Sequence, residues 1–325
     1  MKKIRVAING FGRIGRAFFK VAKQYTDIEI VAVNDLGSID TMNYLLKYDS
    51  VYGTTDLSLD GVKYVSEKEP SKLPWKDLDI DVVVESTGLF TSTEKAKVHL
   101  DAGAKRVVIS APIKDDDSPT VLMAMNEDKL KTCEISSNAS CTTNASSPLL
   151  AILDETIGVE KALLNTVHAY TASQALVDGP SKKDVREGRA AALNVVPSST
   201  GAAIAVTKTM PQLTGLFDGI SIRVPVPVGS IADITFISKK NTTREEVNEI
   251  LKKAAMEERW KGIFTVTEDE IVSSDIKGNS HASIADLAFT RVVGGNLVKV
   301  LGWYDNEMGY TSTLVQHVVA AGRLI

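Results

Sequence analysis

The sequence predicts an α/β protein with two domains, a doubly wound parallel sheet followed by an α+β domain with a mixed or antiparallel sheet. Three observations predict this fold. In the first third of the chain, short apolar and β-branched runs alternate with helical patterns, as in a parallel sheet covered on both faces. A glycine-rich turn, Gly10–Gly15, follows the first of these runs. From about residue 160, longer apolar runs follow one another with few helical patterns between them.

The first part of the chain contains four predicted strands, the last two of which are entered from polar or small residues. These strands are Ile4–Ile8, Glu29–Val33, Asp81–Val84 and Arg106–Ile109. After the glycine-rich turn, the apolar residues Phe18, Phe19, Val21 and Ala22 have the spacing of one helical face. Strand, turn and helix in this order predict the first βα unit of the parallel sheet.

The second part contains longer predicted strands and a terminal helix. The strands are Ala162–Val167, Gly219–Val226, Ala232–Ser238 and Asn296–Val300. Residues Thr311–Leu324 place Leu314, Val315, Val318 and Val319 on one face, which predicts a helix.

Composition narrows the class of protein. The 325 residues suggest two domains at ~150 residues each. The net charge of −4 removes the electrostatic case for a nucleic-acid binder, and no apolar run approaches the ~18 residues that span a bilayer. Two cysteines cannot build a disulfide framework, and the N-terminal segment MKKIRVAING has no apolar signal core. We therefore expect a cytoplasmic enzyme or binding protein with no nucleic-acid or membrane partner.

The glycine-rich turn has the pattern of a dinucleotide site. Gly10, Gly12 and Gly15 fit G-x-G-x-x-G between a predicted strand and a predicted helix. The first permits the sharp turn, the second lets a pyrophosphate approach, and the third lets helix and strand pack closely. Asp35 ends the second strand, where a carboxylate would accept from ribose hydroxyls and repel a 2′-phosphate, favouring NAD. The alternative is a plain glycine turn beside an incidental aspartate.

Cys141 is the candidate nucleophile. It lies between a predicted strand and a helix, where the helix dipole would lower the thiol pKa, although Pro148 allows the regular helix to begin later. A cysteine read alone is more often a small buried side chain than a nucleophile, but the hydroxyls and amides of Ser137–Asn144 are poor core material. Cys133 has no such surroundings and is interpreted as structural.

Of the four histidines, only His168 follows a predicted strand and begins a polar loop. A histidine beside Cys141 could act as its general base, but the sequence leaves open whether the two meet. His99 and His317 lie on predicted helices and are expected at the surface, and His281 in a loop. None has a metal-ligand spacing, so no metal site is expected.

Two further patterns are compatible with anion binding. Arg223 lies in an apolar strand, where it needs either an internal salt bridge or a bound phosphate or carboxylate. Ser198–Gly201 could cap the helix Ala202–Val206 or cradle an anion, and the two are compatible.

Eight motifs, in order along the whole chain, carry a family resemblance. They are NGFGRIGR (Asn9–Arg16), LLKYDS (Leu45–Ser50), STGLF (Ser86–Phe90), SNASCTTN (Ser137–Asn144), DGPSKKD (Asp178–Asp184), SSTGAA (Ser198–Ala203), RVPVPV (Arg223–Val228) and WYDNEMGY (Trp303–Tyr310). With these motifs the chain resembles phosphorylating glyceraldehyde-3-phosphate dehydrogenases.

The resemblance implies a reaction and a set of site residues. Family members oxidise glyceraldehyde 3-phosphate with NAD and inorganic phosphate to 1,3-bisphosphoglycerate, and Cys141 and His168 match the nucleophile and the base. Thr171 and Arg223 match groups that hold the substrate phosphate. The other matches hold inorganic phosphate (Ser140, Thr142, Thr200 and Gly201) or NAD (Arg13, Ile14, Asp35, Ser110 and Asn306).

The resemblance also implies a homotetramer, a Rossmann-type NAD-binding domain over residues 1–140 completed by a C-terminal helix at 306–325, and a catalytic domain over 141–305. Asp178–Arg189 resembles a loop at a subunit interface. The sequence departs from the family pattern at Glu187, Ile204 and Val228-Gly229.

Two rival functions remain open at this point. Erythrose-4-phosphate dehydrogenase shares the cysteine motif, although Thr171 favours the three-carbon substrate. A dinucleotide-binding regulatory protein without catalysis is the rival of another class, and the presence of both Cys141 and His168 argues against it.

Overall fold

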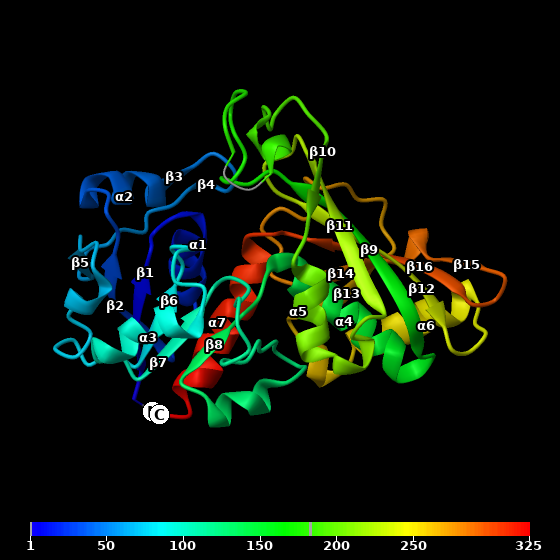
Figure 1. The fold of residues 1–325 in the computed structure, drawn as a ribbon, viewed down its shortest axis with the longest axis horizontal. Helices are drawn as coiled ribbons and strands as arrows, with labels where there is room; N and C mark the ends of the chain where they lie inside the picture. The colour runs from blue at the N-terminus through cyan, green and yellow to red at the C-terminus, as the bar shows by residue number, and fades with distance from the viewer. Residues whose placement is uncertain (1, 182–183) are drawn as a thin grey trace. The chain divides into compact units, whose positions relative to one another are not determined.

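The chain folds into two compact units. The computed structural model describes residues 2–181 and 184–325 (Figure 1). The first unit is formed by Met1–Ser140 with Thr311–Ile325, and the second by Cys141–Tyr310. Lys182 and Lys183, part of the motif at Asp178–Asp184, lie outside the described residues.

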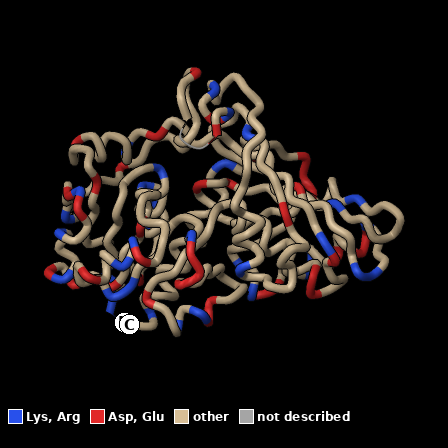
Figure 2. Tube along the Cα trace, viewed as in Figure 1, with Lys and Arg blue, Asp and Glu red and all other residues tan. Residues whose placement is uncertain are grey.

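Basic and acidic positions are interspersed along the trace in Figure 2. No helix among the described residues is long and apolar enough to cross a membrane.

The first unit contains the predicted parallel sheet, in the order β5-β2-β1-β6-β7-β8. Its strands are β1 (Ile4–Asn9), β2 (Ile28–Asn34), β5 (Lys63–Val65), β6 (Val82–Glu85), β7 (Arg106–Ile109) and β8 (Ile135–Ser137). All neighbouring pairs are parallel. Strand β6 is buried along its whole length, as expected for a strand covered on both faces. A separate small hairpin pairs β3 (Tyr48–Asp49) with β4 (Gly53–Thr54).

The helices of this unit are α1 (Arg13–Ala22), α2 (Ile39–Lys47), α3 (Thr93–Asp101) and α7 (Met308–Gly322). Helix α1 buries Phe18, Phe19, Val21 and Ala22, the face that the spacing predicts. Helix α7, red in Figure 1, runs beside β8, where His317 Nε2 lies 2.8 Å from Ser136 Oγ. The C-terminal helix is thus part of the first unit over most of its length.

The expectation that His99 and His317 lie at the surface is wrong. Both side chains are fully buried. His99 lies 3.0 Å from Glu85 and accepts from the indole N–H of Trp75 at 3.2 Å. His317 bonds Ser136 and also lies 3.2 Å from Asn138 Oδ1. Each histidine is buried because polar partners far away in sequence satisfy its ring nitrogens.

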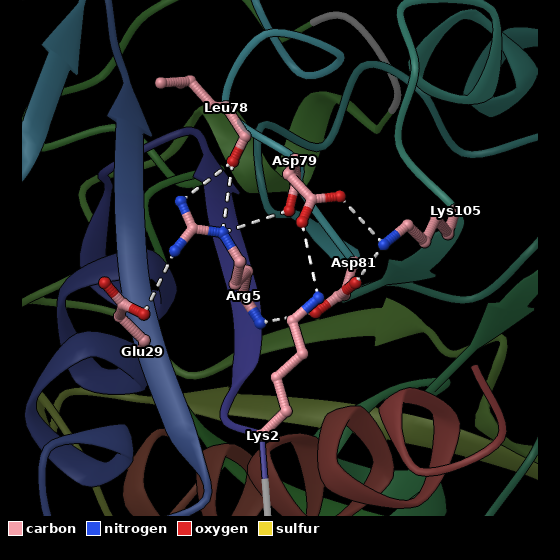
Figure 3. Close-up of polar contacts among 7 residues, drawn as sticks. All are labelled: Lys2, Arg5, Glu29, Leu78, Asp79, Asp81 and Lys105. Atoms are coloured by element: carbon pink, nitrogen blue, oxygen red, sulfur yellow. Dashed lines mark hydrogen bonds and ion pairs between the residues drawn. The ribbon is translucent and has the colours of Figure 1, made fainter.

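An ionic cluster joins the amino ends of the central strands (Figure 3). Asp81 accepts from the backbone N–H of Arg5 at 2.9 Å and from Lys105 Nζ at 2.6 Å. The Arg5 guanidinium donates to the carbonyl of Leu78 at 3.0 Å. These contacts link β1, β6 and β7 at one edge, opposite the carboxyl ends where the glycine-rich turn lies.

The second unit contains the predicted mixed sheet, in the order β10-β11-β9-β12-β16-β14-β13, with β15 paired to β16. The strands are β9 (Val159–Ala169), β10 (Val196–Ser199), β11 (Phe217–Val224), β12 (Ser230–Ser238), β13 (Phe264–Thr267), β14 (Ser283–Asp286), β15 (Arg291–Val293) and β16 (Leu297–Tyr304). Pairs β9/β11 and β13/β14 are parallel, and the remaining pairs are antiparallel. Alternate residues of β12 are buried, so one face of the sheet forms the core.

The helices of the second unit are α4 (Cys141–Thr156), α5 (Ala202–Thr209) and α6 (Arg244–Ala255). Helix α4 is buried from Thr142 to Leu153 and packs against α5, α6 and β14. It begins at Cys141 and continues through Pro148, so the regular helix starts at the cysteine and not at the proline. Short 3₁₀ helices connect the elements of both units: η1 (Pro70–Lys72), η2 (Glu127–Thr132), η3 (Val185–Gly188), η4 (Pro211–Leu213), η5 (Glu258–Trp260) and η6 (Leu287–Phe289).

Candidate active site

The glycine-rich turn of the first unit has three distinct steric requirements. Gly10 has φ +93°, and a Cβ there would lie 2.8 Å from the backbone N of Thr87. A Cβ on Gly15 would overlap the carbonyl oxygen of Gly10. A Cβ on Gly12 would meet nothing within 4 Å. The turn therefore needs glycine at Gly10 and Gly15 for its own packing, whereas Gly12 leaves open space beside the start of α1.

That open space suits a dinucleotide pyrophosphate. Gly12 is the N-cap of α1 and has no side chain to cap the first N–H groups of the helix. A helix N-terminus of this kind favours a phosphate, through these N–H groups and the helix dipole. Arg13, the first residue of α1, pairs with Asp49 at 3.3 Å, and the half-buried Ile14 follows it. The residues present fit a bound NAD at this turn.

Asp35 is fixed by the backbone around it. Its Oδ2 accepts from the N–H of Phe11 at 2.7 Å, and its Oδ1 from the N–H of Gly37 at 3.0 Å. The half-buried carboxylate thus lies beside the glycine-rich turn, as a ribose-binding group would. Ser110 directly follows β7, and its N–H donates to Glu85 at 2.9 Å.

In the second unit, Cys141 and His168 meet. Cys141 is the first residue of α4, and His168 lies near the end of β9. Cys141 Sγ lies 3.3 Å from His168 Nε2, within hydrogen-bond distance for sulfur. The candidate nucleophile and the candidate base are therefore in the mutual geometry that general-base activation needs.

The protonation states of this pair differ from the sequence-based expectation. Burial raises the pKa of Cys141, while the Arg223 charge and a hydrogen bond from Thr142 lower it. Backbone N–H groups at the start of α4 do lower the Cys141 pKa, as expected, but loss of hydration outweighs them, so the expectation of a lowered pKa overall is wrong. Burial and the Arg223 charge lower the pKa of His168 to about 3. At neutral pH the pair is a thiol facing a neutral imidazole.

Two neighbours impose opposite requirements on His168 Nδ1. The carbonyl oxygen of Ala169 lies 2.6 Å from this nitrogen, and Arg223 Nη1 lies 2.5 Å from it. A carbonyl can only accept, which favours a proton on Nδ1 and a lone pair on Nε2 facing the thiol. A guanidinium can only donate, which favours the reverse. Arg223 thus opposes the tautomer that would take the proton of Cys141.

The Arg223 guanidinium has a nitrogen that is available to bind an anion. Its Nε is buried without a hydrogen-bond partner, and no carboxylate among the described residues pairs with it. Of the two interpretations of this arginine, the internal salt bridge is therefore wrong. A bound phosphate or carboxylate would satisfy the guanidinium.

The remaining predicted phosphate ligands have varied surroundings. The half-buried Thr171 has its Oγ1 3.0 Å from Ser173 Oγ. Thr200 Oγ1 accepts at 3.1 Å from the N–H of Ala202, the first residue of α5, and the N-cap Gly201 beside it is exposed. Thr142 is buried, with its Oγ1 2.9 Å from Tyr304 Oη.

Ser140 is half-buried and ends the first unit, and Asn306 belongs to the second. The Asn306 Oδ1 accepts from the N–H of Gly229 at 3.1 Å. Gly229, one of the departures from the family pattern, has φ +91°, and a Cβ there would lie 2.6 Å from the Ser273 carbonyl oxygen. Glycine is therefore required in this turn, and its N–H orients Asn306.

Tyr304 is a neighbour of the cysteine–histidine pair that the sequence did not single out. Its hydroxyl lies 2.7 Å from Thr166 Oγ1 and also bonds Thr142. Its ring packs edge-on against His168, with centroids 5.9 Å apart. Burial raises the Tyr304 pKa, so it remains a neutral phenol. The sequence signal that could have identified it is its place in the motif Trp303–Tyr310, where a tyrosine offers a hydroxyl group on an aromatic ring.

The described residues contain no group of three His, Cys, Asp or Glu side chains that could hold a metal ion.

Residues 140–306 match the family "Glyceraldehyde 3-phosphate dehydrogenase, C-terminal domain", and residues 4–93 match "Glyceraldehyde 3-phosphate dehydrogenase, NAD binding domain". Among similar proteins, the glyceraldehyde-3-phosphate dehydrogenase of Streptomyces coelicolor is 49% identical over 98% of this chain and 98% of its own length. That of Mycobacterium avium is 50% identical over 98% of this chain and 99% of its own length. The similarity therefore covers both compact units.

Proposed function

The chain belongs to the glyceraldehyde 3-phosphate dehydrogenase family, and from this premise we propose that it oxidises glyceraldehyde 3-phosphate, with NAD and inorganic phosphate, to 1,3-bisphosphoglycerate. The observation that carries the proposal is the 3.3 Å approach of Cys141 Sγ to His168 Nε2, beside a guanidinium with an unsatisfied nitrogen. A nucleophile, a base and an anion-binding group in one place are the parts that this reaction needs.

Cys141 and His168 carry the covalent chemistry. His168 Nε2 takes the thiol proton, and the Cys141 thiolate attacks the aldehyde carbon. The proton on His168 passes to the aldehyde oxygen, which gives a hemithioacetal with a hydroxyl group and returns His168 to the neutral form. NAD, when bound, supplies an acceptor for the substrate's hydride. His168, neutral again, takes the hydroxyl proton of the hemithioacetal as its carbon becomes a thioester. A phosphate oxygen then attacks the thioester carbonyl, the carbon–sulfur bond breaks, and Cys141 leaves as the thiolate.

Two sets of groups hold the phosphates in this proposal. Thr171 and Arg223 bind the phosphate of the substrate. The attacking phosphate is bound by Ser140, Thr142, Thr200 and Gly201. The buried Nε of Arg223, without a partner, supports the assignment of this guanidinium. Because Thr142 Oγ1 is engaged by Tyr304, we assign its contribution to the backbone N–H rather than to the hydroxyl.

The first unit is the NAD-binding domain in this proposal, and the second unit is the catalytic domain. The glycine-rich turn, with Arg13 and Ile14, binds the pyrophosphate, and Asp35 binds the ribose. Ser110 and Asn306 are assigned to NAD by their match to the family. The open space beside Gly12 and the backbone-held carboxylate of Asp35 support the assignment.

We further infer a homotetramer that works in the cytoplasm. Large exposed apolar side chains gather in and beside the loop Asp178–Arg189. These are Leu176, Val177, Val185, Leu193 and Val195, each at least 65% exposed. A partner subunit would cover such side chains. Glu187, which departs from the family pattern, lies in this loop and accepts from Ser198 Oγ at 2.9 Å. Ile204, another departure, is 67% exposed on α5.

The test follows NADH formation with glyceraldehyde 3-phosphate and with erythrose 4-phosphate, each with and without phosphate or arsenate. We expect faster turnover of the three-carbon aldehyde and dependence on phosphate or arsenate. Faster turnover of the four-carbon sugar would assign the chain to the rival dehydrogenase. NAD binding without any turnover would assign it a regulatory role.

A further inference from the structure

A buried polar network connects the interior of the first unit to the glycine-rich turn, and the proposed mechanism does not use it. At its centre is Glu85, the last residue of β6, which is 1% exposed. Four donors reach its carboxylate. They are Asn9 Nδ2 at 2.6 Å, His99 Nε2 at 3.0 Å, the Thr87 N–H at 2.8 Å and the Thr87 hydroxyl. The Glu85 carboxylate oxygens therefore act as acceptors for donors from three residues, Asn9, His99 and Thr87.

Trp75, at the end of the network away from the glycine-rich turn, fixes the direction of the hydrogen bond between His99 and Glu85. Trp75 Nε1–H can only donate, and it points at His99 Nδ1 from 3.2 Å. Nδ1 must therefore carry a lone pair, and the single proton of a neutral imidazole lies on Nε2, directed at Glu85. Trp75, His99 and Glu85 thus form a chain of donors and acceptors with one possible polarity.

The near end of the network shapes the dinucleotide turn. Glu85 binds both the N–H and the hydroxyl of Thr87, and this N–H is the group that a Cβ on Gly10 would strike. Ser86 Oγ donates to the carbonyl of Gly10 at 2.7 Å. Asn9, which also donates to Glu85, accepts at 2.7 Å through its side-chain oxygen from Asn34, the residue before Asp35. The carboxylate therefore contacts groups that border the glycine-rich turn and Asp35.

We propose that Glu85, oriented by His99 and Trp75, is a positioning residue that holds the glycine-rich turn in the shape that binds NAD. This inference rests on the proposed function, because it concerns the affinity of the same site. Glu85 and His99 themselves need not touch the cofactor.

The test compares NAD affinity, measured by calorimetry on the full-length protein stripped of cofactor, with stability measured in urea. His99→Leu removes the donor to Glu85, and we expect it to weaken NAD binding about tenfold. The KM for NAD should rise by a similar factor, and kcat at saturating NAD should stay within about twofold. His99→Gln supplies an amide N–H in place of Nε2–H, and we expect it to restore affinity to within about threefold.

Two further variants separate positioning from general stability. His317→Leu removes another fully buried histidine of the same unit, and we expect it to leave NAD affinity unchanged even where it lowers stability. Glu85→Gln is nearly isosteric and gives a second test if His99→Leu does not fold. It should weaken NAD binding at least tenfold, because its amide group would face donors.

The outcomes separate a failure of the positioning role from a failure of the proposed function. If the unaltered protein binds NAD and the His99 and Glu85 variants bind it equally well, the positioning role is overturned and the proposed function stands. An equal loss of affinity in His99→Leu and His317→Leu would also overturn it, since burial alone would then explain the loss. If the unaltered protein binds no NAD, the proposed function and this inference both fail.

Discussion

Arg223 of β11 is paired in register with His168 of β9, and its guanidinium Nη1 lies 2.5 Å from the imidazole Nδ1. This contact joins the candidate anion-binding group to the candidate base. An anion bound by Arg223 would draw the guanidinium away from Nδ1 and offset its charge. The carbonyl of Ala169 would then hold the proton on Nδ1, and Nε2 would be the acceptor that Cys141 needs. In the proposed function, binding of the substrate phosphate by Arg223 would therefore be coupled to activation of His168 as the base.

Replacing Arg223 therefore alters the titration of both reactive groups. The Arg223 charge lowers the pKa of His168 and also that of Cys141, so Arg223→Met should raise both. We expect the pH profile of Cys141 alkylation by iodoacetamide to move to higher pH. Arg291→Met, which removes an exposed arginine from the same unit, is the matched control and should leave the profile unchanged. An unshifted profile in Arg223→Met would show that the guanidinium does not act on the pair.

The three glycines of the turn predict two different kinds of defect. Gly12→Ala places its Cβ in open space, so the free energy of unfolding should change by less than ~1 kcal/mol while NAD affinity falls at least tenfold. Gly15→Ala meets the Gly10 carbonyl oxygen and should destabilise the protein by about 1–3 kcal/mol. Urea unfolding and calorimetric titration with NAD measure the two effects. Full NAD affinity in Gly12→Ala would place the pyrophosphate elsewhere.

Asp35 predicts the choice between NAD and NADP. Its carboxylate would repel a 2′-phosphate, so Asp35→Ala should lower the ratio of kcat/KM for NAD to that for NADP by about tenfold or more. Because Asp35 also accepts from Phe11 and Gly37, Asp35→Asn is the companion variant, which removes the charge but keeps an acceptor. If neither variant changes the ratio, the specificity has another origin.

Two buried neutral histidines predict a loss of stability in acid. Burial lowers the pKa of both His168 and His317 to about 3, against 6.5 in the unfolded chain. Below pH 6.5 the unfolded chain therefore binds protons that the folded chain does not, and the free energy of unfolding decreases as the pH is lowered from 6.5 towards 3. Each histidine contributes a slope of up to ~1.4 kcal/mol per pH unit. Urea unfolding of His317→Gln should show a correspondingly shallower slope, and an unchanged slope would contradict the assignment.

Local features of the site were predictable from the sequence. The glycine-rich turn, Asp35 and the start of α1 lie within a short stretch whose backbone requirements are encoded in residue types and their offsets. The strand Arg106–Ile109 is predicted with the bounds that β7 has in the structure. Such elements depend on neighbours along the chain, so pattern and propensity suffice to find them.

Contacts between distant residues were not predictable in the same way. The pairing of His168 with Arg223 depends on the register of β9 against β11, which no local pattern encodes. The burial of His99 depends on Glu85 and Trp75, and that of His317 on Ser136. A polar residue on a helix is expected at the surface unless partners across the fold satisfy it, and those partners become visible only in three dimensions.

The central claim is that Cys141 forms a thioester that phosphate then cleaves. The most direct measurement mixes the enzyme, NAD and glyceraldehyde 3-phosphate without phosphate and counts the NADH formed. We expect a burst of one NADH per Cys141 thiol that then stops and resumes when phosphate is added. Cys133→Ser should behave like the unaltered protein, and Cys141→Ser should bind NAD but form no NADH. Steady NADH formation without phosphate, or a burst in Cys141→Ser, would contradict the account.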